Sequence, residues 1–334
     1  WKLKSAYMPK DAGTVFSCFA CAGGSTMGYK LAGFDVIGCN EIDPKVAAVY
    51  NKNHKPRYPF VCSIRDMLDK ELPEALYNLD ILDGSPPCTS FSTAGVRDRD
   101  WGKAKKFSEG QAHQRLDDLF FEFIAIAAKL RPKIVIAENV TGIIKGKAKG
   151  YVKEIVQAFK AAGYMAQLFN LNAANMGVPQ ARQRVFFLAR RNDLGLQPIS
   201  LKFNEKPITF GEVSGWGLRR GNERLTIPLK EVALWKQCKP GNSLGSVHPK
   251  GNYFTHTKLS NRRPAPTFVA GSRRGFYHPT EPRMLSYAEW IACSTFPQDY
   301  DFNNQDPRWF MAMSVPPFMV QRIALEIRTQ WMGD

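Results

Sequence analysis

The stretch TVFSCFACAGGSTMG, residues 14–28, decides the fold class of this 334-residue chain. Its first residues, up to Phe19, are apolar and favour a strand, and the glycines Gly23 and Gly24 separate them from a helical pattern over residues 25–32. A Gly-rich turn between a strand and a helix lets backbone N–H groups approach a cofactor closely. The same stretch also fits a tight turn that binds nothing.

Apolar β-rich runs continue to alternate with amphipathic helical stretches as far as about residue 190. The alternation predicts an α/β fold in which helices wrap a largely parallel sheet. Further strands are predicted at residues 36–42, 60–64, 80–82, 134–137, 165–171 and 185–189, and helices at 44–53, 119–130 and 151–162.

The composition changes after Arg191, where Gly, Pro, Asn, Arg and Lys become frequent and no helical alternation is visible up to about Tyr277. Helical patterns resume at residues 286–294 and 317–331. We therefore predict a discontinuous larger domain, residues 12–191 plus 280–334, and a smaller irregular domain, residues 192–279.

The net charge of +16 indicates a polyanionic partner, although a generally solvated basic surface is the alternative. Seven cysteines, an odd and thinly spread number, indicate reduced thiols, and the lone pair Cys18 and Cys21 does not predict a metal site. No run approaches the roughly 20 apolar residues of a membrane helix. We expect a cytoplasmic protein without a membrane partner.

Glu41 ends the second predicted strand, where an acidic side chain can accept both ribose hydroxyls of a nucleoside. The preceding turn does not match GxGxxG, because Cys21 and Ser25 stand at glycine positions. This favours a cofactor with a single adenosine over a dinucleotide.

A candidate nucleophile, Cys88, lies in the segment DGSPPCTSFS, residues 83–92, directly after a strand. Two prolines stiffen the segment, and Arg97 and Arg99 can supply the positive field that ionises a thiol. A buried, inert cysteine is the alternative.

Two polar segments follow later strands. Glu138, followed by Asn139 and Val140, ends one strand and can exchange a proton with a ring nitrogen, or else act as a helix cap or an ion-pair partner. The segment QARQR, residues 180–184, opens another strand, so its side chains at 180, 182 and 184 are expected on one face. One of these arginines can bind a carbonyl oxygen of a base, unless this is merely the solvated face of an edge strand.

In order and spacing, these segments resemble the C5-cytosine-specific DNA methyltransferase family of bacterial or phage type. Nearly the whole chain takes part, including RPAPTF at 263–268, TFPQDY at 295–300 and VPP at 315–317. The resemblance implies a Rossmann-like methyltransferase fold that depends on S-adenosylmethionine, with a target-recognition domain at residues 192–279.

The resemblance also implies site residues and roles. Cys88 would attack C6 of a flipped-out cytosine, Glu138 would hold N3, Arg182 would hold O2, and Asn139 would position the loop that carries the cysteine. Residues 90–107 would close over the base. The residues implied to contact S-adenosylmethionine are Phe19, Ala22, Gly23, Gly24, Glu41, Ile42, Ser63, Ile64, Pro86, Leu119, Ser314 and Val315.

Four residues depart from the family pattern, namely Cys21, Ser63, Thr89 and Met313. None removes a catalytic group, but a lost acceptor for the adenine amine would weaken cofactor binding by on the order of 1 kcal/mol. The implied partner is double-stranded DNA, bound by a monomer. A cognate restriction endonuclease is compatible with the resemblance, and no stable complex with it is implied.

Three other functions remain open from the sequence. An RNA cytosine-5 methyltransferase would use the same scaffold, although the long basic insertion favours duplex DNA. A non-catalytic nucleic-acid-binding module would keep the fold without the reaction. A Rossmann dehydrogenase is disfavoured by the missing GxGxxG and by the Pro-Pro-Cys segment.

Overall fold

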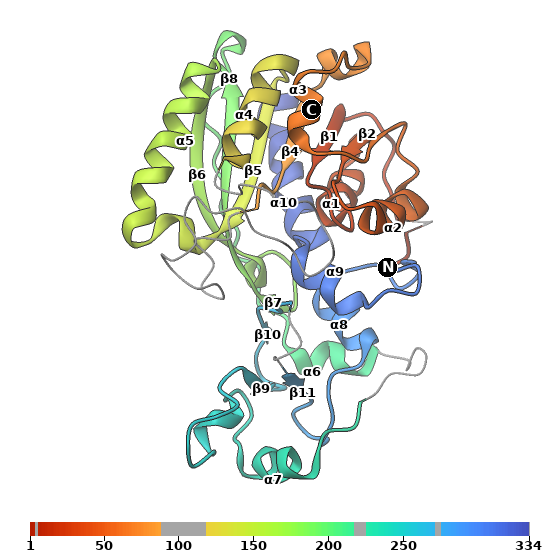
Figure 1. Ribbon diagram of the computed structural model, residues 1–334, viewed down its shortest axis with the longest axis vertical. Helices are drawn as coiled ribbons and strands as arrows, with labels where there is room; N and C mark the ends of the chain where they lie inside the picture. The colour runs from red at the N-terminus through yellow and green to blue at the C-terminus, as the bar shows by residue number, and fades with distance from the viewer. Residues whose placement is uncertain (4–5, 88–117, 217–224, 271–274, 334) are drawn as a thin grey trace. The chain divides into compact units, whose positions relative to one another are not determined.

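The computed structural model describes residues 1–3, 6–87, 118–216, 225–270 and 275–333 (Figure 1). The chain groups into two compact units. The larger unit comprises residues 7–171, 183–202 and 320–334, and the smaller unit comprises residues 1–6, 172–182 and 203–319. These bounds differ from those of the predicted domains, because residues 172–182 and 280–319 group with the smaller unit and residues 192–202 group with the larger one.

The larger unit is built on one seven-stranded sheet with the order β3-β2-β1-β4-β5-β8-β6. Strands β3, β2, β1, β4 and β5 run parallel to one another, whereas β8 runs antiparallel to β5. The predicted α/β fold class is thereby confirmed. The strand bounds are Thr14–Cys18 (β1), Asp35–Asn40 (β2), Tyr58–Phe60 (β3), Ile81–Gly84 (β4), Ile134–Val140 (β5), Tyr164–Asn172 (β6) and Gln183–Arg191 (β8).

Helices cover both faces of this sheet, and α4 and α5 lie side by side over one of them (Figure 1). The rings of Phe120 in α4 and Phe159 in α5 both pack against the ring of Phe187 in the sheet. Phe187, Phe159 and Phe123 are fully buried. The helix bounds are Gly24–Leu31 (α1), Pro44–His54 (α2), Ile64–Leu68 (α3), Leu119–Leu130 (α4), Lys149–Ala161 (α5) and Pro317–Ile327 (α10), the last followed by a π turn over Arg328–Met332.

The strand predicted at residues 60–64 is wrong, because the strand ends at Phe60 and a helix begins at Ile64. Ser63 caps that helix, and the Asp66 side chain accepts a hydrogen bond from the Ser63 N–H at 3.1 Å. A reciprocal cap of this kind satisfies two backbone N–H groups at a helix N-terminus. It explains why a helix begins here, where the apolar pattern alone favours a strand.

The smaller unit combines short helices with two-stranded sheets, which pair β7 with β10 and β9 with β11. The expectation that side chains 180, 182 and 184 share one strand face is wrong. The strand is interrupted at Arg182, so that β7 and β8 belong to different sheets. The bounds are Gln180–Ala181 (β7), His256–Lys258 (β9), Ala265–Pro266 (β10), Gly275–Tyr277 (β11), Phe210–Val213 (α6), Leu229–Gln237 (α7), Tyr287–Cys293 (α8) and Pro307–Met313 (α9).

Within the described parts of the chain, no helix combines the length and the apolar character needed to cross a membrane.

Candidate functional site

The turn between β1 and α1 has an unusual backbone. Phe19, Cys21 and Gly23 all have positive φ, at 53°, 46° and 68°. A Cβ atom on Gly23 would lie 2.3 Å from Nε2 of His54, so only glycine fits there. No side chain caps the N-terminus of α1. Its first amide groups therefore point toward a position where an anionic group is favoured.

Glu41, at the end of β2, lies beside this turn. Its carboxylate accepts hydrogen bonds from the N–H of Cys21 at 2.9 Å and from the N–H of Asp43 at 3.1 Å. Burial raises the pKa of Glu41, and these backbone donors oppose that rise. Each carboxylate oxygen can accept a further hydrogen bond, so Glu41 can still receive hydroxyl groups.

Apolar side chains surround the same end of the sheet. Ile64, Pro86 and Leu119 are buried, Ile42 is half-buried, and the ring centroid of Phe19 lies 6.4 Å from that of Phe123. Ala22 and Gly24 are buried in the turn itself. The Ser63 hydroxyl accepts a hydrogen bond from the N–H of Arg65 at 3.3 Å, which is a structural role that the sequence analysis missed.

A carboxylate and a guanidinium meet where β5 pairs with β8. Oε1 of Glu138 lies 2.8 Å from Nε of Arg184, and both side chains are about one-eighth exposed, at 12% and 13%. Burial lowers the pKa of Arg184, and the neighbouring Glu138 opposes this shift. The antiparallel pairing of β5 with β8 sets Val140 opposite Arg184. Glu138 is two residues before Val140 on the same strand, so its side chain lies on the same face of the sheet as that of Arg184.

Asn139, the neighbour of Glu138, is buried, and both polar atoms of its side-chain amide form hydrogen bonds. Its Nδ2 donates to the carbonyl of Pro86 at 3.2 Å, and its Oδ1 accepts from the N–H of Val140 at 2.8 Å. This side chain therefore ties the end of β5 to the segment that leads into Cys88. Cys88 itself, Thr89 and the segment 90–107 lie outside the described residues.

Arg182 belongs to the smaller unit, where it is only 2% exposed. Its guanidinium donates to the carbonyl of Phe268 at 3.2 Å and to the carbonyl of Ala312 at 2.9 Å. Ser314 and Val315 are also buried in this unit. Of the predicted catalytic residues that the structure describes, the larger unit thus brings together Glu138 and Asn139, and it places Arg184 of the QARQR segment beside Glu138.

Asp83, the first residue of the segment that carries Cys88, is a buried carboxylate with partners of its own. It lies in β4, is 4% exposed, and accepts hydrogen bonds from Ser17 Oγ at 2.9 Å and from the Tyr29 hydroxyl at 3.1 Å. Burial raises the pKa of Asp83 to about 7, and the charge of Glu138 contributes to the rise. A carboxylate inside the otherwise apolar strand Ile81–Gly84 is the sequence signal that marks it.

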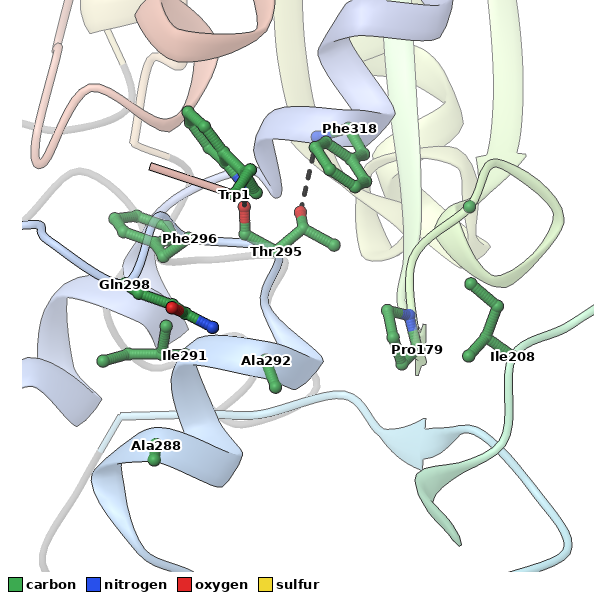
Figure 2. Close-up of a pocket in the computed structure, with 11 residues that line it drawn as sticks. Trp1, Pro179, Ile208, Ala288, Ile291, Ala292, Thr295, Phe296, Gln298 and Phe318 are labelled. Carbon is green, nitrogen blue, oxygen red and sulfur yellow. Dashed lines mark hydrogen bonds between the residues drawn. The ribbon is translucent and has the colours of Figure 1, made fainter. Parts of the chain in front are cut away.

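The smaller unit also contains an apolar cavity of about 350 Å³, which Figure 2 shows. Ile291, Ala292, Phe296 and Phe318 line it, and the polar groups come from Thr295 and Gln298. None of its described lining residues is charged, and none is a predicted site residue. In the described ranges, no three His, Cys, Asp or Glu side chains cluster in a way that could hold a metal ion.

The amino-acid sequence of the chain is similar to those of known proteins. Residues 13–214 match the sequence profile of the family described as C-5 cytosine-specific DNA methylase. The chain is 32% identical to the type II methyltransferase M.FnuDI of Fusobacterium nucleatum, over 81% of this chain and 74% of that protein. It is 33% identical to the type II methyltransferase M.XorII of Xanthomonas oryzae, over 92% of this chain and 83% of that protein.

Solved structures share the fold. A prophage-encoded protein of E. coli, described as a DNA modification methyltransferase, superimposes with a TM-score of 0.72 at 19% identity, covering 95% of this chain and 99% of that one. DNMT2 of Spodoptera frugiperda superimposes with a TM-score of 0.65 at 16% identity, over 94% of this chain and 99% of that one.

Proposed function

Because the chain belongs to the C-5 cytosine-specific DNA methylase family and is a DNA (cytosine-5-)-methyltransferase, we propose that it methylates a flipped-out cytosine within a specific duplex sequence. The methyl donor is S-adenosylmethionine. The observation that carries this proposal is the pairing of Glu138 with Arg184, next to the bond from Asn139 to Pro86. These contacts assemble acidic and basic groups beside the segment that leads into Cys88.

The described residues fit S-adenosylmethionine. The strained turn around Gly23 and the uncapped α1 suit the carboxylate of its methionine part, and Glu41 suits its ribose. Phe19, Ile64, Pro86 and Leu119 would cover its apolar parts, with Ala22, Gly24, Ile42, Ser63, Ser314 and Val315 as further proposed contacts. When bound, the cofactor supplies an electrophilic methyl group.

The protein's own task is to activate cytosine, whose C5 is a poor nucleophile in the aromatic ring. The Cys88 thiolate adds to C6 and makes C5 enamine-like. In its protonated form, Glu138 gives its carboxyl proton to N3 and so favours this addition. After methylation a base removes the C5 proton, the C5–C6 double bond re-forms, and the bond from C6 to Cys88 breaks to return the thiolate.

We assign the contact with cytosine O2 to Arg184 instead of Arg182. The reason is that Arg184 accompanies Glu138, whereas the guanidinium of Arg182 already donates to two main-chain carbonyls. Arg182 would then hold the short β7 segment against its own unit.

Since C5 and C6 are inaccessible in a stacked duplex, the target base must leave the helix. We propose that residues 192–279 read the surrounding sequence. The protein acts as a monomer in the cytoplasm, and any cognate restriction endonuclease shares its recognition sequence without forming a stable complex with it.

Base-resolution methylation mapping of DNA from cells that express the protein tests this function and identifies its target. We expect 5-methylcytosine at one short sequence, absent from cells that express Cys88→Ser. Labelled methyl transfer to purified duplex DNA and to tRNA provides the comparison. Transfer to tRNA alone would replace the proposed substrate with RNA.

A further inference from the structure

An exposed aromatic side chain stands out in the smaller unit. Phe254 is 76% exposed, which among the described large apolar residues is exceeded only by Leu229 at 88%. It lies in the segment 248–256, here called the aromatic loop, whose sequence is HPKGNYFTH. Nothing in the proposed reaction uses this loop.

The aromatic loop is internally braced. Nδ1 of His248 accepts hydrogen bonds from the N–H groups of Lys250 and Asn252, both at 3.2 Å. The Tyr253 ring lies 5.5 Å from the His248 ring and 5.1 Å from the His256 ring, between centroids. His256 in turn stacks on buried Tyr277 at 5.8 Å. These contacts fix the loop to β9 and β11.

The backbone next to Phe254 is strained. Tyr253 has φ 66°, a conformation that an aromatic residue rarely adopts. Its carbonyl accepts hydrogen bonds from the N–H of His256 at 2.9 Å and from Ser243 Oγ at 3.2 Å. A Cβ at Gly245 would approach Cα of Phe254 to 2.9 Å. Such strain persists only where surrounding contacts enforce it, and it concentrates at functional positions.

The surroundings of Phe254 suit DNA. Within its loop Lys250 and Asn252 are exposed, and the same unit exposes Lys239, Arg262 and Arg263. The whole chain carries a net charge of +16, which attracts a polyanion. In protein–DNA complexes, apolar side chains contact the thymine methyl group or insert between base steps. A phenyl ring on a braced loop, in a unit that exposes lysine and arginine side chains, fits either contact.

We propose that Phe254 is a specificity-determining residue that contacts a base of the recognition sequence in duplex DNA. This inference rests on the proposed role of residues 192–279 as the part that reads DNA. The braced loop supplies the fixed position, Phe254 supplies the base contact, and Lys250 supplies a positive charge from the same loop.

The test compares Phe254→Ala with Tyr77→Ala, a control at an exposed aromatic residue of the larger unit that lies outside residues 192–279 and outside the proposed site. Each variant is assayed on duplex oligonucleotides that carry the mapped sequence or one substitution within it. We expect Phe254→Ala to lower kcat/KM on the mapped sequence about tenfold or more, and to relax discrimination at one base position. Tyr77→Ala should stay within about twofold of the parent, and both variants should unfold close to the parent temperature because the side chains are exposed.

A second measurement separates this inference from the proposed function. Duplexes selected from a randomised pool by binding to Cys88→Ser, and to the same protein with Phe254→Ala, report base preference without any methylation. A changed preference at one position supports the role of Phe254 even if methyl transfer fails. Identical base preference and affinity in both selections would overturn the inference. A Phe254→Ala substitution that changes only the oligomeric state of the protein, and not its base preference, would also overturn it.

Discussion

Arg182 and Arg184 are two residues apart and have different surroundings. Arg182 donates to two main-chain carbonyls, whereas Arg184 pairs with Glu138. Arg182→Ala leaves those carbonyls without their donor and should lower the free energy of unfolding by about 2–4 kcal/mol. Arg184→Ala should instead lower the single-turnover methylation rate by about 100-fold with a smaller loss of stability.

Thermal unfolding and single-turnover methylation, measured on both variants, check this division of roles. Lysine at each position is the matched control, because it keeps the charge and loses the fork of donors. A catalytic loss confined to Arg182→Ala would return the contact with cytosine O2 to that residue.

Asp83 should make stability depend on pH. Burial raises its pKa to about 7, whereas an unfolded aspartate titrates near 3.9. Between these values the folded protein retains a proton that the unfolded chain has lost, so stability falls as pH rises from about 4 to about 7. The difference corresponds to up to about 4 kcal/mol. Asp83→Asn cannot ionise and should flatten this dependence.

Urea unfolding at about pH 5 and about pH 8 measures the effect. The parent should lose stability between the two conditions, and the loss should be smaller in Asp83→Asn. Equal pH dependence in the two proteins would show that Asp83 does not titrate in this range.

At the scale of elements, the turn between β1 and α1 shapes the end of the sheet where we propose that the cofactor binds. Gly23→Ala combines a positive φ of 68° with an overlap against the His54 ring. It should lower the free energy of unfolding by about 2–4 kcal/mol and weaken S-adenosylmethionine binding. Part of this loss in the free energy of unfolding is caused by the overlap with the His54 ring. The double variant Gly23→Ala with His54→Ala should therefore be at least about 1 kcal/mol more stable than the sum of the two single losses predicts.

Denaturant unfolding and calorimetric titration with S-adenosylmethionine, applied to the two single variants and the double variant, provide this comparison. Strictly additive losses would show that the His54 ring does not restrict the turn.

The sequence predicts most of the elements but not how some of them end. Apolar periodicity predicts β1, α1, α4 and β5, because burial on the sheet determines those positions. It mispredicts residues 60–64, where the cap formed by Ser63 and Asp66 starts a helix. It also misses the break at Arg182, because the pairing of Gln180 and Ala181 with β10 depends on residues far along the chain.

The same limit applies to the site. Glu138 and Asn139 follow from their place at a strand end, and their positions agree with that reasoning. The pairing of Arg184 with Glu138 depends on the antiparallel register of β5 and β8, which the sequence pattern does not reveal. Asp83 was quoted within its motif, but its role depends on Ser17 and Tyr29, which come from two other elements.

At the scale of the whole molecule, the net charge of +16 should control the affinity for DNA. Each phosphate contact made by lysine or arginine releases counterions, so binding to a duplex should weaken at least roughly tenfold between about 50 and 200 mM salt. Fluorescence anisotropy with a labelled duplex measures this slope. Affinity that does not change with salt would argue against a phosphate-tracking surface.

Covalent trapping tests the central claim most directly. A duplex with 5-fluorocytosine at the mapped target position is incubated with the protein and S-adenosylmethionine, because fluorine at C5 blocks the elimination that would release Cys88. We predict a protein–DNA band that survives denaturing electrophoresis and is absent from Cys88→Ser. The absence of such a band from the parent protein, under conditions in which it binds both the duplex and the cofactor, would contradict the account.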